Sequence, residues 1–143
     1  MRIHDILAAK PQHEVVTVSP SSTVRELVEL LAEHNVGALV VSSDGRACEG
    51  IVSERDVVRH LRTNPEILDS TVNDIMTAAV HTATRTDKLD DMMSVMTEHR
   101  VRHIPVIEDE VLVGIISIGD VVKHKISALE FERDQLDSYV HQT

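Results

Sequence analysis

Two serine–aspartate pairs have a spacing that suits binding of a phosphate and a sugar diol. Ser53 and Asp56 follow one short apolar segment, and Ser117 and Asp120 follow another of the same pattern. In both copies a strand is expected to meet a helix at the serine, and the first turn of a helix has unpaired N–H groups and a positive dipole end. An anion can bind there while the carboxylate accepts hydrogen bonds from hydroxyl groups. The implied ligand is therefore a phosphate attached to a sugar diol.

The same pairs are also compatible with a structural role. Ser-x-x-Asp at the start of a helix resembles a capping box, in which the serine and the acidic residue satisfy free N–H groups. Two copies in register strengthen the binding-site interpretation without excluding the cap, since a duplication also copies caps. Both interpretations are kept as alternatives.

The composition restricts the class of protein. The chain has 143 residues, 14 Lys and Arg against 24 Asp and Glu, and a net charge of −10. Its aromatic residues are Phe131 and Tyr139, and the basic residues form no cluster, so a nucleic-acid-binding surface is not expected. Cys48 is the single cysteine, which excludes an intrachain disulfide and a cysteine-based zinc site. No apolar run approaches the roughly 20 residues of a membrane span and no apolar leader follows Met1, so we expect a cytoplasmic protein without membrane insertion.

The sequence offers no candidates for catalysis. No nucleophile and base are placed as a pair, and the histidines lack the spacing of metal ligands. We therefore expect no enzyme activity, no metal and no required cofactor.

The chain contains an internal repeat. Leu27 and Met92 lie 65 residues apart, and Ser53 and Ser117 lie 64 apart. Each copy has a helix with apolar residues at i, i+3, i+4 and i+7, followed by two apolar segments joined by a turn. The methionines at these positions in the second copy are predicted to belong to the core.

The order of elements predicts an α+β fold of two stacked β-α-β-β-α repeats with a C-terminal helix. The expected strands cover residues 15–18, 36–41, 49–53 and 80–83, and the expected lead-in helices cover residues 2–8 and 72–76. The predicted segments are a first repeat over 1–70, a second repeat over 71–125 and a C-terminal helix over 126–143. Because one half cannot bury both faces of its small sheet, the halves should stack, with the two serine–aspartate pairs facing a shared cleft.

This pattern resembles the paired cystathionine-beta-synthase (CBS) domain, also called a Bateman module. The resemblance rests on the two Gly-Ile-x-Ser-x-x-Asp segments, on Asp-Ile-Met-Thr at 74–77 and on His-Arg-Val-Arg-His-Ile-Pro-Val at 99–106. It covers roughly residues 1–125. It implies a regulatory module that binds AMP, ADP or ATP, or sometimes NAD or S-adenosylmethionine, in clefts between the repeats, and that commonly forms a dimer.

The resemblance implies two ligand sites, each built from both repeats. In the first, Asp56 would hold the ribose hydroxyls, and the residues implied near phosphate or adenine are Ser53, Arg55, Thr77, Val80, Arg102 and His103. In the second, Asp120 would hold the ribose, and the other implied residues are Val15, Val36, Gly37, Ala38, Ile115 and Ser117. The two sites differ in charge, since Gly37 and Ala38 replace Arg102 and His103 by repeat register and Gly119 replaces Arg55. Strong phosphate binding is therefore expected only at the first site.

The resemblance and the residues together predict a regulatory sensor of adenosine nucleotides (AMP, ADP, ATP or NAD) without catalysis. The alternative is a structural module that binds no ligand and acts on an unidentified regulated protein through a dimer surface. A homodimer is expected, because the last helix carries a heptad-like stripe that could pair with a second copy. Its residues are Val122, Ile126, Leu129, Arg133, Leu136 and Val140.

Overall fold

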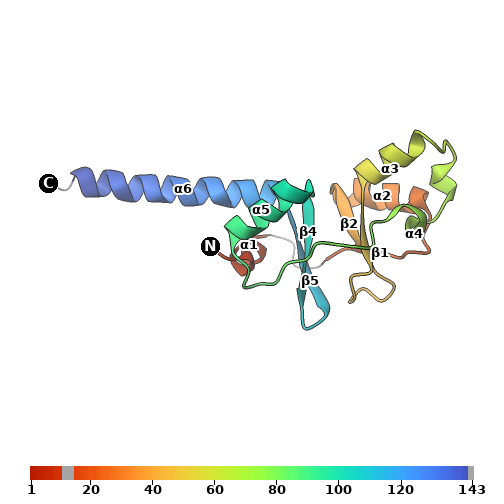
Figure 1. The fold of residues 1–143 in the computed structure, drawn as a ribbon, viewed down its shortest axis with the longest axis horizontal. Helices are drawn as coiled ribbons and strands as arrows, with labels where there is room; N and C mark the ends of the chain where they lie inside the picture. The colour runs from red at the N-terminus through yellow and green to blue at the C-terminus, as the bar shows by residue number, and fades with distance from the viewer. Residues whose placement is uncertain (11–14, 142–143) are drawn as a thin grey trace.

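The first half of the protein is a three-stranded sheet covered by helices. The computed structural model describes residues 1–10 and 15–141. Strand β2 (Ala38–Val41) lies in the centre, parallel to β1 (Thr17–Val18) and antiparallel to β3 (Gly50–Ser53). Helices α2 (Val24–His34) and α3 (Glu54–Leu61) and the short 3-10 helix η1 (Ile67–Asp69) complete this half (Figure 1).

The second half repeats this order with a smaller sheet. Helix α5 (Leu89–His99) precedes an antiparallel pair of strands, β4 (His103–Glu108) and β5 (Val111–Ser117). The strand predicted at residues 80–83 is reduced to one parallel bridge between Ala83 and Val106. The predicted strand was too long, because the backbone of Ala83 pairs with the carbonyl of Pro105 and the N–H of Ile107, whereas the next N–H, that of Thr84, donates to the side chain of Asp87.

The long helices form as their apolar spacing predicts. The hydroxyl of Thr23 accepts a hydrogen bond from the N–H of Glu26 and caps α2, and the helix buries one stripe. In α5, Met92 and Met96 are buried, which confirms that the methionine stripe belongs to the core. Both helices end at a residue in the left-handed conformation, Asn35 in α2 and Arg100 in α5.

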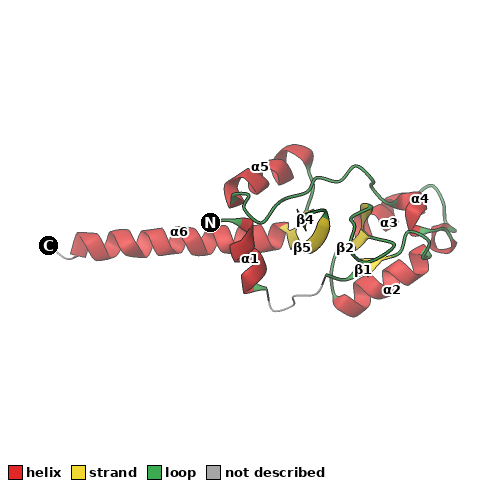
Figure 2. Cartoon of the chain, turned by 90° about the horizontal axis from the view of Figure 1, so that it is seen from below, coloured by secondary structure: helices red, strands yellow, loops and turns green. Residues whose placement is uncertain are grey.

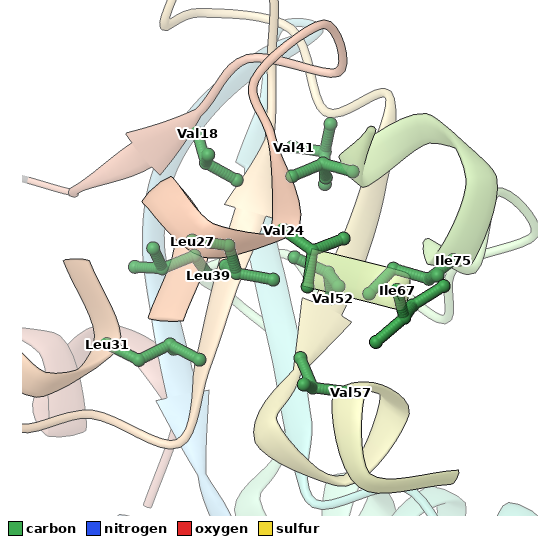
Figure 3. Packing of buried hydrophobic residues seen from close by; sticks show 11 residues of the cluster. Val18, Val24, Leu27, Leu31, Leu39, Val41, Val52, Val57, Ile67 and Ile75 are labelled. Carbon is green, nitrogen blue, oxygen red and sulfur yellow. The ribbon is translucent and has the colours of Figure 1, made fainter. Parts of the chain in front are cut away.

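The two lead-in helices are exchanged between the halves. Helix α1 (Ile3–Ala9) buries Ile3 and Ile6 in the core of the second half, beside Met92 and Met96. Helix α4 (Val72–Ile75) is buried in the core of the first half, and Figure 3 shows Ile75 packed there. Each core is therefore completed by a segment from the other repeat, which ties the two halves together (Figure 2).

The C-terminal helix is one continuous element that extends away from the body. Helix α6 (Ile118–His141) has 24 residues and projects as an arm in Figures 1 and 2. Val121 near its start is buried, whereas Leu129, Phe131 and Leu136 are exposed. Among residues 1–10 and 15–141, none of the helices combines the length and the apolarity needed to cross a bilayer.

Candidate functional site

The first cleft lies where the ends of β3 and β4 meet the start of α3. Its volume is about 470 Å³. The residues implied for the first site all line it, namely Ser53, Arg55, Asp56, Thr77, Val80, Arg102 and His103. They come from both repeats, so the exchange of lead-in segments and the stacking of the halves build this cleft together.

The serine–aspartate pair in this cleft forms a capping box. The N–H of Ser53 donates to Asp56 Oδ2 at 2.8 Å, and the N–H of Asp56 donates to Ser53 Oγ at 3.2 Å. The N–H of Glu54 is also used, because it donates to the carbonyl of Gly37 at 3.0 Å. The capping interpretation is thus confirmed, and the ligand-binding role of Asp56 stays a prediction. Two of the first N–H groups of α3 are committed to the protein, so side chains must supply most of any anion-binding capacity.

Arginine side chains give this cleft its charge. The cleft is lined by Arg55, Arg59, Arg100 and Arg102, against the carboxylates of Glu54 and Asp56. By repeat register the same four positions in the other half are Gly119, Lys123, Asn35 and Gly37. A local excess of guanidinium groups in a chain of net charge −10 attracts anions, and arginine can engage two phosphate oxygens at once.

Arg100 is held in a backbone conformation that arginine seldom adopts. Its φ is 54°, whereas the matching residue of the first half, with φ of 52°, is asparagine. Asparagine enters the left-handed region more readily than arginine does. Backbone strain of this kind collects at binding sites, where a side chain is needed for function. Arg100 is therefore a candidate phosphate-binding residue, a role that the resemblance did not assign to it.

His103 lies between the two clefts. Burial lowers the pKa of His103 below its ordinary value, although the carboxylates of Asp120 and Glu54 act in the opposite direction. His103 also faces Gly37, where an added Cβ would lie 3.5 Å from its ring. Burial thus disfavours the charged imidazolium form of His103, whereas the arginines stay charged and give the first cleft its positive charge. At the edge of this cleft, His81 and His99 stack with ring centroids 4.1 Å apart.

The second cleft is smaller and more apolar. It has a volume of about 400 Å³, and four residues implied for the second site line it, namely Val15, Val36, Ala38 and Ile115. Gly37 lines the first cleft instead, because it faces His103 at the junction of the halves, and Ala38 lines both clefts. The prediction placed Gly37 in the second site, whereas the structure places it on the first cleft, and its role in ligand binding stays a prediction.

Ser117 and Asp120 form the same cap at the start of α6, but they do not line the second cleft. The N–H of Ser117 donates to Asp120 Oδ2 at 2.9 Å, and the N–H of Asp120 donates to Ser117 Oγ at 3.1 Å. The side chain of Lys10 lines the cleft and donates to the same Asp120 oxygen at 2.9 Å. The two clefts therefore differ in what contacts the carboxylate as well as in charge.

Several lining residues were not predicted from the motifs. In the first cleft they include Arg59, which lies one helical turn after Arg55, and Arg100, which belongs to the matched segment 99–106 but was not assigned to the site. In the second cleft the principal one is Lys10, whose partner Asp120 is 110 residues away in the chain.

Within residues 1–10 and 15–141, no group of three or more His, Cys, Asp or Glu side chains is placed to hold a metal ion.

The fold and the paired clefts define a tandem-repeat module with two potential ligand sites. The sequence profile of the CBS domain matches residues 3–63 and 72–127. The chain therefore belongs to the CBS-domain family, as a tandem pair, and both the resemblance and the predicted fold class are confirmed. CBS-domain pairs are regulatory modules.

Relatives and solved structures support this assignment. The chain is 41% identical over 123 residues to the CBS domain-containing protein CBSX3, mitochondrial, of Arabidopsis thaliana, covering 82% of this chain and 60% of that protein. A CBS-domain protein from Agrobacterium tumefaciens is 37% identical with a TM-score of 0.83, covering 87% of this chain and 99% of that one. The CBS domain pair of MJ0100 is 25% identical with a TM-score of 0.78, covering 90% and 98%. That structure contains 5′-methylthioadenosine and S-adenosyl-L-methionine, so some members of the family bind adenosine compounds.

Proposed function

We propose that this protein is a regulatory sensor that binds an adenosine nucleotide (AMP, ADP, ATP or NAD) in the first cleft and has no catalytic activity. The observation that supports this most strongly is the joint placement of the Asp56 carboxylate and four arginines around one cleft. The carboxylate suits ribose hydroxyls, the guanidinium groups suit phosphate, and Ile51 and Val80 offer apolar surface to a base. Nucleotide binding would then change the affinity for a regulated protein that is still to be identified.

The charge of the cleft ranks the candidate ligands. S-Adenosylmethionine carries a sulfonium cation, which four arginines disfavour. Phosphorylated ligands gain a charge-assisted contact for each phosphate group that reaches a guanidinium. We expect ATP and ADP to bind more tightly than AMP, and AMP more tightly than adenosine.

Titration calorimetry with AMP, ADP, ATP, NAD and adenosine tests this function. A sensor binds at least one of the phosphorylated compounds, with an affinity that falls as salt rises. If none of them binds and the chain still associates with other proteins, the alternative of a ligand-free interaction module is correct.

Asp56→Asn should weaken nucleotide binding about tenfold, which corresponds to about 1.4 kcal/mol. The asparagine oxygen can still accept the N–H of Ser53, but it loses the charge that strengthens hydrogen bonds from ribose hydroxyls. Calorimetry gives the affinity and urea denaturation gives the stability. Asp74→Asn is the matched control, because Asp74 forms the same kind of capping box with Thr71 outside the cleft. Unchanged affinity in Asp56→Asn would leave Asp56 with only its capping role.

Arg100→Asn should stabilise the protein by up to about 1 kcal/mol while it lowers its affinity for AMP several-fold. Asparagine is the residue that the first half already uses at the matching position, so backbone strain should decrease. Binding of adenosine, which has no phosphate, should change little. Arg62→Asn removes the same charge outside the cleft and should alter neither affinity. A stabilised variant with undiminished AMP affinity would show that Arg100 does not contact phosphate.

A homodimer joined through α6 is part of this proposal. The exposed apolar residues along α6 include four members of the heptad-like stripe, Val122, Ile126, Leu129 and Leu136. An antiparallel pair of α6 helices with this stripe at the contact would place Lys123 of one copy near Asp137 of the other, which is an opposite-charge pair. Sedimentation of the chain ending at Lys125 tests this. The shortened chain should be folded and monomeric where the full chain is dimeric, and equal association of both chains would assign the dimer to another surface.

A further inference from the structure

The side chain of Lys10 lines the second cleft and contacts Asp120, the carboxylate that the resemblance assigns to a ribose. Its ammonium group donates to Asp120 Oδ2 at 2.9 Å and to the carbonyl of Ile115 at 2.8 Å. Both partners are about three-quarters buried, with side-chain exposures of 28% for Lys10 and 25% for Asp120. Burial raises the pKa of Asp120, but the hydrogen bonds from Lys10 and Ser117 outweigh it and lower that pKa below its ordinary value. Asp120 is therefore an ionised carboxylate with an internal cation as its partner.

The first cleft has alanine where the second has Lys10. In the lead-in segments Ile3 matches Val72 and Ile6 matches Ile75, so the register differs by 69 and Lys10 matches Ala79. Ala79 lines the first cleft and cannot reach Asp56 with a charge. Asp56 thus lines the first cleft without a lysine partner from the lead-in segment. Asp120 is instead paired with Lys10 of the same chain.

The backbone of the two lead-in segments explains this difference. Helix α4 ends at Ile75, and the following chain is extended enough for the N–H of Thr77 to bond the carbonyl of Ile51 at 2.9 Å. Helix α1 continues to Ala9, so the residue that matches Thr77 is still helical. The carbonyl of Ile115, which matches Ile51, receives the ammonium of Lys10 instead. The longer helix α1 brings Lys10 to the second cleft, where its ammonium group contacts Ile115 and Asp120.

We propose that Lys10 is a specificity-determining residue that excludes the ribose of a nucleotide from the second cleft, so that each chain binds one nucleotide. This inference rests on the proposed function of the first cleft. To bind at Asp120, a ribose would have to replace the ion pair between Lys10 and Asp120 with a hydrogen bond from an uncharged hydroxyl group, and the partly buried ammonium of Lys10 would lose its carboxylate partner. It would also leave the carbonyl of Ile115 without the ammonium donor.

The test compares Lys10→Met with the natural sequence by titration calorimetry, using adenosine and AMP as probes. Methionine keeps the length of the side chain and removes the ammonium group. The natural chain should bind one molecule of each probe, and Lys10→Met should bind two, with the second lost again in Lys10→Met/Asp120→Asn. Lys10→Arg keeps the positive charge and should stay at one. Lys125→Met is the matched control, because Lys125 also pairs with an aspartate, Asp90 at 3.0 Å, outside both clefts, and it should stay at one.

The reciprocal variant moves the lysine to the other cleft. Ala79→Lys should lower the affinity of the first cleft at least tenfold, and thermal melting reports whether each variant is folded. Two sites in the natural chain, or one site in a folded Lys10→Met variant, would overturn the inference. If the natural chain binds neither probe, the proposed function fails by itself, and Lys10 is still tested by whether Lys10→Met gains one site.

Discussion

Replacing Ile6 with alanine should lower the free energy of unfolding by about 2–5 kcal/mol, the usual range for truncating a fully buried isoleucine. Ile6 has no exposed surface and lies in the core of the second half, although it belongs to the first repeat of the sequence. The second half should therefore be the part of the protein that becomes less stable. Urea denaturation measures the total effect, and limited proteolysis locates the segment that opens first.

Two further variants make this result specific. Ile75→Ala removes the matching residue of α4, which is buried in the core of the first half, so that half should open first. Val28→Ala on α2 removes a side chain that is 39% exposed and should have a much smaller effect. If Ile6→Ala opened the first half instead, the exchange of lead-in helices would be incorrect.

The sequence predicts the repeats well because hydrophobic spacing reports which residues are buried. The stripe containing Leu27 and its counterpart Met92 predicts helices, and both are found with those residues in a core. The same spacing does not tell which core a segment joins. Ile3 and Ile6 would satisfy their pattern equally well against either half, so the exchange of α1 and α4 could not be derived from periodicity.

The sequence also located the first cleft better than the second. The motif residues Ser53, Asp56 and Thr77 line the first cleft as the resemblance implied. Arg100 belongs to the motif at 99–106 but was not assigned to the site, although its match with Asn35 was available from the repeat register. Lys10 was missed because a contact between residues 110 positions apart leaves no local pattern in the chain. The difference in charge between the two sites was therefore predictable from the repeat register, whereas the contact of Lys10 with Asp120 required the structure.

Each half has a glycine in its motif strand three residues before the serine, and the exchanged lead-in segment approaches it closely. A Cβ at Gly50 would lie 2.8 Å from the sulfur of Met76 and 2.9 Å from the carbonyl oxygen of Thr77. A Cβ at Gly114 would lie 2.6 Å from a terminal methyl of Leu7. The two contacts differ in kind, because the end of a leucine side chain can rotate away and a backbone carbonyl cannot.

Gly50→Ala should therefore destabilise the protein by about 1–3 kcal/mol, the range for overpacking, and Gly114→Ala by clearly less. The Thr77 carbonyl that must move accepts the N–H of Ile51 at 2.9 Å, and both residues line the first cleft. Nucleotide affinity should accordingly fall in Gly50→Ala and remain nearly unchanged in Gly114→Ala. Urea denaturation and calorimetry on both variants measure these effects. A Gly114→Ala variant as unstable as Gly50→Ala would mean that Leu7 is held as firmly as the backbone of Thr77.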